Sequence, residues 1–281
     1  PTNYTSKNYT IPKTVSSMKT FAFNSRTNLQ DITIQSKETK YFEAFKNLLN
    51  LKVIRVGKEC EQIDITIPLM SLTAFDVDKD NSKYSSIDGV LYSKDKKKLL
   101  KYPSGKKGNS FVLPETVDEI ENGAFSSTSL KKIKLHESLK MIGEYVFNNS
   151  QLLETINIPE NVEFIGQSAF AYCSSLKEIT IPLLVETIDD KAFQYCTSLT
   201  TVIFMDGLIE IGNSVFEVQT GSMADTINPG DWIVVKNEKD IKLDDIVTYS
   251  QDGDFITHRV VETYNDTFVT KGDANNSKDD P

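Results

Sequence analysis

The sequence repeats a unit of 23 residues several times. A leucine, an isoleucine or valine, and a phenylalanine return at this interval in a fixed order. The repeated positions are Leu130, Leu153, Leu176 and Leu199, then Ile133, Ile156, Ile179 and Val202, and then Phe147, Phe170, Phe193 and Phe216. A further row, with one interval of 22 residues, comprises Ile120, Ile142, Ile165, Ile188 and Ile211. A period of this length is typical of solenoids, in which each coil buries its apolar face only against its neighbours.

Each unit joins a strand pattern to a turn pattern. In the segment 176–181 the isoleucines alternate with polar residues, which predicts a short strand with one face inward. Pro182 then ends the strand, because proline has no N–H for the ladder. The segment 165–170, Ile-Gly-Gln-Ser-Ala-Phe, predicts a turn or short helix whose phenylalanine fills the opposite wall. The predicted fold class is therefore mostly β, with short helices and turns.

The same frame is present nearer the amino terminus, after Phe23 and Phe45. Their partners are Leu29, Ile32 and Ile34 in one unit and Leu51, Ile54 and Val56 in the next. The region 74–114 departs from the step, and in it Asp88-Gly89 separates two apolar runs. That dipeptide is typical of tight hairpins, so we expect a β-hairpin inserted into the solenoid.

These units resemble the leucine-rich repeats of bacterial BspA-type surface proteins. The resemblance covers roughly residues 1 to 216 and rests on the Ala-Phe pair, on Cys-x-Ser-Leu, and on Ser-Ile-Asp-Gly-Val-Leu-Tyr in the insert. It implies a leucine-rich-repeat solenoid, a parent protein at the cell surface, and adhesion or binding of a protein ligand. No residue pattern names that ligand.

The repeat frame fails after Phe216, where Ser222 stands in place of the expected leucine. The composition changes there too, to short β-rich runs separated by polar turns. These runs are 232–235, 246–249, 255–261 and 267–270. They are typical of a small β domain. The predicted domains are therefore a solenoid over 1–213 and a second unit over 214–281.

Three boxes in the second unit carry a further resemblance. They read Thr-Gly-Ser-Met-Ala-Asp-Thr-Ile from Thr220, Thr-His-Arg-Val from Thr257, and Lys-Gly-Asp-Ala-Asn from Lys271. In this order they resemble type I signal peptidases of the archaeal, endoplasmic-reticulum and sporulating-bacterial branch, over about 65 residues. The resemblance implies a membrane-anchored serine endopeptidase on the extracytoplasmic side, which cleaves signal peptides from secretory pre-proteins.

The chemistry of such a site can be assigned to particular residues. A serine hydroxyl needs a base to take its proton, and His258 is the only imidazole in this part of the chain. The other histidine, His136, lies in the repeats and is expected to be an exposed loop residue. The resemblance makes Ser222 the nucleophile and Asp279 the orienting acid.

Other residues of the boxes have supporting parts. The resemblance ranks Asp273 second to Asp279 as the acid and leaves Asp280 as a solvated charge. Thr220 keeps a hydroxyl for the oxyanion hole, and Gly221 supports the turn beside the nucleophile.

Two departures from the peptidase pattern affect its interpretation. Ala224-Asp225 stands where a proline usually precedes the threonine, and the sequence stops at Pro281, where family members continue. Repeats also occupy the place of the amino-terminal anchor. We therefore expect a truncated peptidase in an engineered chimera, with the solenoid as a soluble carrier. The alternative is a cell-surface repeat protein with an inert tail.

Composition restricts the partners. The net charge is −9 and the pI about 4.9, which argues against nucleic acid as a ligand. Three cysteines without a CxxC pair predict neither a disulfide framework nor a zinc site, and no cofactor is expected. Cys173 and Cys196 occupy equivalent repeat positions and should stack. No apolar run reaches the roughly 20 residues that cross a bilayer, so we expect a soluble chain.

Overall fold

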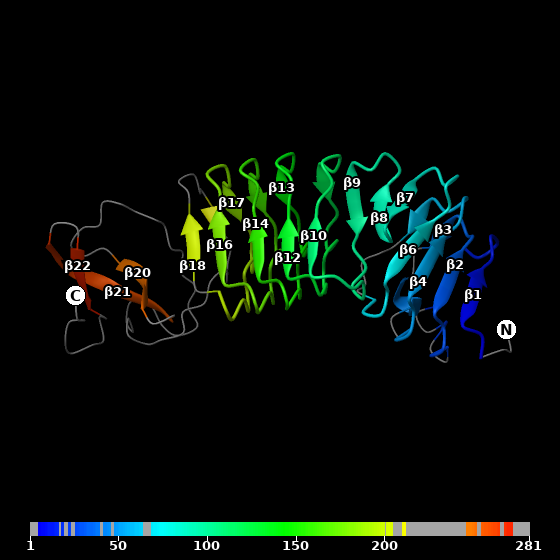
Figure 1. The fold of residues 1–281 in the computed structure, drawn as a ribbon, viewed down its shortest axis with the longest axis horizontal. Helices are drawn as coiled ribbons and strands as arrows, with labels where there is room; N and C mark the ends of the chain where they lie inside the picture. Colours follow the sequence, from blue (N-terminus) through cyan, green and yellow to red (C-terminus); the bar gives the residue numbers. More distant parts are fainter. Residues whose placement is uncertain are drawn as a thin grey trace.

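The computed structural model describes most of the chain as far as residue 204 and shorter segments beyond it. The described residues are 5–16, 18–19, 22–23, 26–39, 42–45, 48–63, 69–199, 201–204, 210–211, 246–251, 254–264 and 267–271. Figure 1 shows the strands of the amino-terminal part stacked side by side along one long axis. This arrangement confirms the solenoid that the 23-residue period predicts.

One wall of the solenoid consists of parallel strands that begin successive coils. They are β1 (Asn8–Ile11), β2 (Asp31–Ile34), β4 (Val53–Val56) and β6 (Ala74–Val77), then β10 (Ser110–Val112), β12 (Lys132–Lys134), β14 (Thr155–Asn157), β16 (Glu178–Ile181) and β18 (Thr201–Phe204). Their register matches the sequence repeat, since equivalent residues of neighbouring repeats lie opposite each other: Ile133 pairs with Ile156, and Ile179 pairs with Val202.

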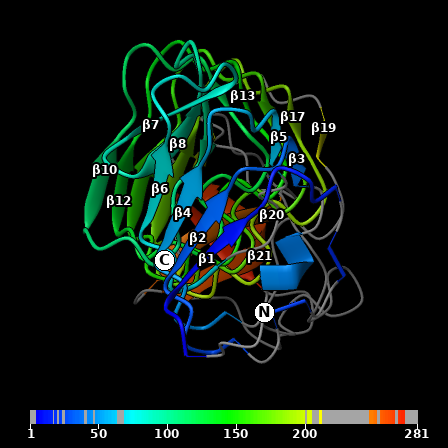
Figure 2. The same ribbon diagram turned by 90° about the vertical axis from the view of Figure 1, so that its right-hand side faces the viewer.

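A second wall lies on another side of the coils (Figure 2). It contains β3 (Glu38–Thr39) with β5 (Gln62–Ile63), β11 (Glu119–Ile120), and the parallel set β13 (Met141–Ile142), β15 (Phe164–Ile165), β17 (Thr187–Ile188) and β19 (Glu210–Ile211). Ile142, Ile165 and Ile188 face each other in register. Among the described residues the one helix is a single 3-10 turn, η1 (Phe42–Phe45). The residues that lead from the isoleucine to the phenylalanine of a repeat, as at 166–170, therefore form turns.

These turns form a third ladder around the phenylalanines. The Phe147 N–H donates to the Ala169 carbonyl at 2.8 Å, and the Phe170 N–H donates to the Ala192 carbonyl at the same distance. Residues two before and two after each phenylalanine have positive φ, as at Ser168 (52°) and Tyr172 (63°). The alternation turns the chain sharply while it keeps every second amide bonded to the next coil.

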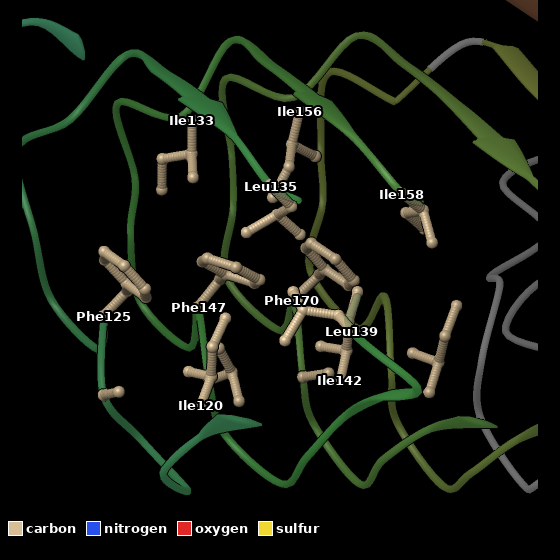
Figure 3. Packing of buried hydrophobic residues seen from close by; sticks show 14 of the residues in the cluster. Ile120, Phe125, Ile133, Leu135, Leu139, Ile142, Phe147, Ile156, Ile158 and Phe170 are labelled. Atoms are coloured by element: carbon tan, nitrogen blue, oxygen red, sulfur yellow. The ribbon is translucent and has the colours of Figure 1, made fainter. Parts of the chain in front are cut away.

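The phenylalanine row forms the centre of the larger core. The ring centroids are 5.4 Å apart for Phe125 and Phe147, 5.1 Å for Phe147 and Phe170, and 5.1 Å for Phe170 and Phe193. Figure 3 shows three of these rings in line, between a row with Ile133 and Ile156 and a row with Ile120 and Ile142. Each coil therefore contributes one ring to a continuous stack.

The predicted hairpin interrupts this stack. Strands β7 (Tyr84–Ile87) and β8 (Val90–Ser93) are antiparallel, and both residues between them have positive φ, 49° at Asp88 and 78° at Gly89. The chain then returns through β9 (Lys98–Lys101), which pairs with β8 and, in parallel, with β11. The hairpin divides the interior, because Leu91 packs into the amino-terminal core and Tyr92 into the larger one.

Lys101, at the end of β9, is a buried cation. Its side chain is 4% exposed, and its Nζ donates to the Gly123 carbonyl at 2.6 Å. Burial lowers the pKa of Lys101 to about 8. The Gly123 carbonyl also accepts the Ser126 N–H at 3.1 Å, so this acceptor keeps a partner when Lys101 is removed.

Replacing Lys101 with methionine is expected to stabilise the protein by about 2 kcal/mol at pH 7. The free energy needed to bury the charged ammonium group is larger than the stabilisation that its one hydrogen bond contributes. Above about pH 8 the folded parent releases this proton before the unfolded chain does, so parent stability rises towards pH 10 and the gain shrinks. Urea denaturation from pH 7 to 10 measures both effects, with exposed Lys97→Met as the control. A variant less stable than the parent at pH 7 contradicts the prediction.

The carboxyl-terminal segments form a separate antiparallel sheet. It consists of β20 (Ile246–Gln251), β21 (Asp254–Tyr264) and β22 (Thr267–Lys271), with an irregularity between Val260 and Glu262. Three of the four predicted runs are therefore strands, and the run 232–235 lies outside the described residues. The β-rich character expected for this part of the chain is confirmed.

Candidate functional site

His258 lies on the central strand of the carboxyl-terminal sheet. Its backbone is paired with Val247 of β20, and the neighbouring Arg259 is paired with Lys271 at the end of β22. Lys271 is the first residue of the Lys-Gly-Asp box. The register therefore places the beginning of the third box directly across from the second, although the two are separated by more than ten residues in sequence.

The other predicted site residues lie outside the described residues: Thr220, Gly221, Ser222, Asp273 and Asp279. The same holds for Asp280 and for the side chain of His258. Their roles stay predictions, as does the domain boundary at 213. Within β21 the described side chains are those of Arg259 and Val261, both half-buried, and of Val260, which is fully buried.

His136 belongs to a turn of the solenoid and is half-buried, not exposed as the sequence suggested. Its Nδ1 lies 2.9 Å from Ser138 Oγ and accepts the Ser138 N–H at 3.3 Å. Ser138 Oγ also lies 3.1 Å from the Val117 carbonyl, to which it donates. The pair closes a local turn and ties it to the preceding coil. The only signal of this contact in the sequence is the spacing of two residues between His136 and Ser138.

Cys173 and Cys196 are stacked in adjacent coils, and they also act as hydrogen-bond donors. Cys173 Sγ donates to the Phe147 carbonyl at 3.2 Å, and Cys196 Sγ to the Phe170 carbonyl at 3.1 Å. In the preceding coil Ser150 Oγ donates to the Phe125 carbonyl at 2.8 Å. Burial raises the pKa of Cys196 to about 12 and that of Cys173 well above its usual value, so both remain thiols.

Comparison with known families decides the nature of the solenoid. The sequence model of the BspA type leucine rich repeat region matches residues 2–67 and 104–221, in six copies. The chain belongs to this family. The match is interrupted between residues 67 and 104, where this BspA-type chain carries its hairpin. A second match, to the Peptidase S24-like family, covers residues 200–277 and identifies a peptidase-like region after the repeats.

Two solved structures resemble the BspA-type chain. One is the pneumococcal vaccine antigen PcpA, with 26% identity, a TM-score of 0.58 and coverage of 73% of this chain. The other is a leucine rich cell surface protein from Faecalibacterium prausnitzii, with 26% identity, a TM-score of 0.56 and coverage of 70%. The chain spans 57% and 59% of the length of these two proteins. No curated protein matches the sequence.

Two further observations concern the described residues alone. None of their helices has the length and apolarity that crossing a membrane requires. They also contain no group of three or more His, Cys, Asp or Glu residues placed to hold a metal ion.

Proposed function

We propose that the carboxyl-terminal region is a serine endopeptidase core of the type I signal peptidase kind, borne on the leucine-rich-repeat solenoid. The match to the Peptidase S24-like family over residues 200–277 supports a peptidase. The observation that carries the proposal is the pairing of Arg259 with Lys271, which brings two of the three sequence boxes together. The Thr-His-Arg box favours histidine over lysine as the base.

The proposed mechanism uses three side chains as nucleophile, general base and orienting acid. Ser222 Oγ attacks the scissile carbonyl while His258 accepts its proton and later returns it to the leaving amine. Asp279 orients the imidazole and stabilises its cationic form. The Ser222 N–H and the Thr220 hydroxyl would donate to the oxyanion, and Gly221 would let the backbone turn beside it.

The proposed substrates are secretory pre-proteins, cleaved after small residues of the signal peptide. The segment 216–220, which leads into the nucleophile, would pair with the extended substrate as an added strand. Main-chain hydrogen bonds would then supply affinity, and pockets for alternate side chains would supply specificity.

Cleavage of a synthetic pre-protein peptide tests this proposal. The parent chain should cut the peptide at one bond, identified by mass spectrometry, and Ser222→Ala should leave it intact because the nucleophile is gone. Ser175→Ala, in the solenoid, is the matched serine control and should cleave like the parent. Equal cleavage by the parent and Ser222→Ala would assign the activity to another residue or to a contaminant.

A second role, protein binding by the solenoid, has its own support. The chain belongs to the BspA-type family, and one similar structure is described as a cell surface protein. We propose a cell-surface parent for the repeats and a parent peptidase at the membrane, facing outward. We further propose that the two were joined by engineering, because repeats stand directly before the peptidase-like region, and the two family matches overlap over residues 200–221.

A further inference from the structure

Strands β10, β12, β14 and β16 lie side by side in one wall (Figure 1), and in β12, β14 and β16 buried residues alternate with exposed or half-buried ones. In β12 the middle residue, Ile133, is buried, while Lys132 and Lys134 are exposed. In β14 Ile156 is buried in the same way, between exposed Thr155 and Asn157. The sequence of each strand therefore fixes what this wall shows to a partner.

The wall and the loops that lead into it are basic, although the chain as a whole is acidic. Residues 106–112, 129–134, 152–157 and 175–180 hold six lysines and two glutamates, a net charge of +4 in a chain of net charge −9. The lysines are Lys106, Lys107, Lys131, Lys132, Lys134 and Lys177, and the glutamates are Glu154 and Glu178.

The second wall has the opposite sign. Residues 118–121, 140–144, 163–167 and 186–190, around β11, β13, β15 and β17, hold eight carboxylates and the single lysine Lys140. Lys98 of neighbouring β9 forms ion pairs with Glu119 at 3.5 Å and Glu121 at 3.1 Å. In Figure 2, β10 and β12 lie on one side of the coils and β13 and β17 on the other. The charges are thus separated between two faces.

Two lysines of the basic wall are available to an outside anion. Lys131 is engaged by Glu154, with Nζ and Oε1 2.7 Å apart, and this contact lowers the pKa of Glu154. Across the described part of the chain, no ion pair joins Lys132 or Lys134 to a carboxylate, although Lys132 adds a weaker Coulomb attraction to Glu154. Both ammonium groups extend from one short strand in the middle of the wall.

We propose that this basic wall docks an extended acidic segment of a partner protein. The proposal rests on the protein-binding role above and assigns to it a face and a partner chemistry. Positive side chains on a net acidic molecule attract carboxylates locally and orient the encounter. Val112, which is 65% exposed, and Asn157 pair in register with Lys134, so apolar and hydrogen-bonding contacts flank the charge.

A peptide fits this wall better than a uniform polyanion does. Glu154 and Glu178 interrupt the lysines, so a chain with a negative charge on every unit would meet repulsion at both. A peptide can place glutamate or aspartate opposite Lys132 and Lys134 and neutral residues elsewhere. Nucleic acids and sulfated polysaccharides are therefore the comparison ligands of the test.

The probe is a fluorescein-labelled peptide in which glutamate alternates with threonine and valine, and fluorescence anisotropy measures binding to the full chain at about 0.05 M salt. The double variant Lys132→Glu/Lys134→Glu should weaken binding by roughly tenfold or more, because two attractions become repulsions. The matched control Lys140→Glu/Lys191→Glu makes the same change in net charge away from this wall and should bind within about twofold of the parent. Circular dichroism confirms that both variants fold.

Three results would overturn the inference. These are no binding of the peptide by the parent, equal losses in the two double variants, and tighter binding of dextran sulfate or a single-stranded oligonucleotide than of the peptide. Failure of the broader binding role has a different signature. In that case the immobilised chain would retain no protein from a surface extract, at low or moderate salt, whatever the charge of the partner.

Discussion

Replacing Phe170 with alanine is expected to lower the free energy of unfolding by about 3–5 kcal/mol. Phe170 is fully buried, and its ring lies 5.1 Å from the rings of both Phe147 and Phe193. The substitution removes a ring that two coils share, so it leaves a cavity with walls on both sides. Solenoid coils are held by contacts with their neighbours, which prevents the two halves of the stack from collapsing into the space.

Tyr172→Ala provides the matched control within the same coil. Tyr172 is also aromatic and also stacks, at 4.8 Å from Tyr195, but its side chain is 45% exposed. Its loss should cost less than about 1 kcal/mol. Urea denaturation followed by far-ultraviolet circular dichroism gives both values. A cost below about 1 kcal/mol for Phe170→Ala would show that the phenylalanine row does not hold the stack together.

The repeat period predicted the solenoid and its register because identical apolar positions must face each other when coils stack. Ile133 opposite Ile156 and Ile165 opposite Ile188 follow from the interval alone. The hairpin was predictable for a similar reason, since Asp88-Gly89 suits the positive φ of its two turn residues. Local rules and spacing point to the same structure in these segments.

Residue propensities did not predict the backbone conformation of the turn ladder. Tyr145, Tyr172 and Tyr195 all adopt positive φ, between 56° and 63°, a region that aromatic residues normally avoid. The coils impose this conformation, because the amides of Tyr145 and Tyr172 donate to carbonyls of the following coil. The hydrogen bonds of the continuous ladder offset a backbone strain of about 1–2 kcal/mol per residue. These bonds join different coils, so the sequence of one segment does not predict them.

The division into two cores also needed the structure. The pattern around residues 84–93 predicts two strands but not which side each faces, and Leu91 and Tyr92 point into different cores. Lys101 illustrates the same limit, because a lysine at the end of a strand is ordinarily exposed. Here the return of β9 into the stack buries its side chain.

For the candidate peptidase site, the sequence boxes name residues and the sheet register supports one part of their arrangement. Motif spacing does not supply the distances among three side chains that come from separate parts of the sequence. The pairing of Arg259 with Lys271 supplies part of this missing information, because it places Lys271, the first residue of the third box, beside the strand of His258. The contribution of His258 can then be measured through catalysis.

His258→Ala is expected to lower kcat/KM for a pre-protein peptide by more than about 10³-fold, as much as Ser222→Ala, because residues of such a site act as a unit. The base must be neutral to accept the serine proton, and an imidazole in water titrates near about pH 6.5. Cleavage by the parent should therefore fall as the pH drops through that region. His136→Ala removes the other histidine of the chain and should leave both the rate and the acid-side fall unchanged. Measuring kcat/KM over a pH series for the parent and the three variants separates the alternatives. Cleavage by His258→Ala at the parent rate would exclude His258 as the base.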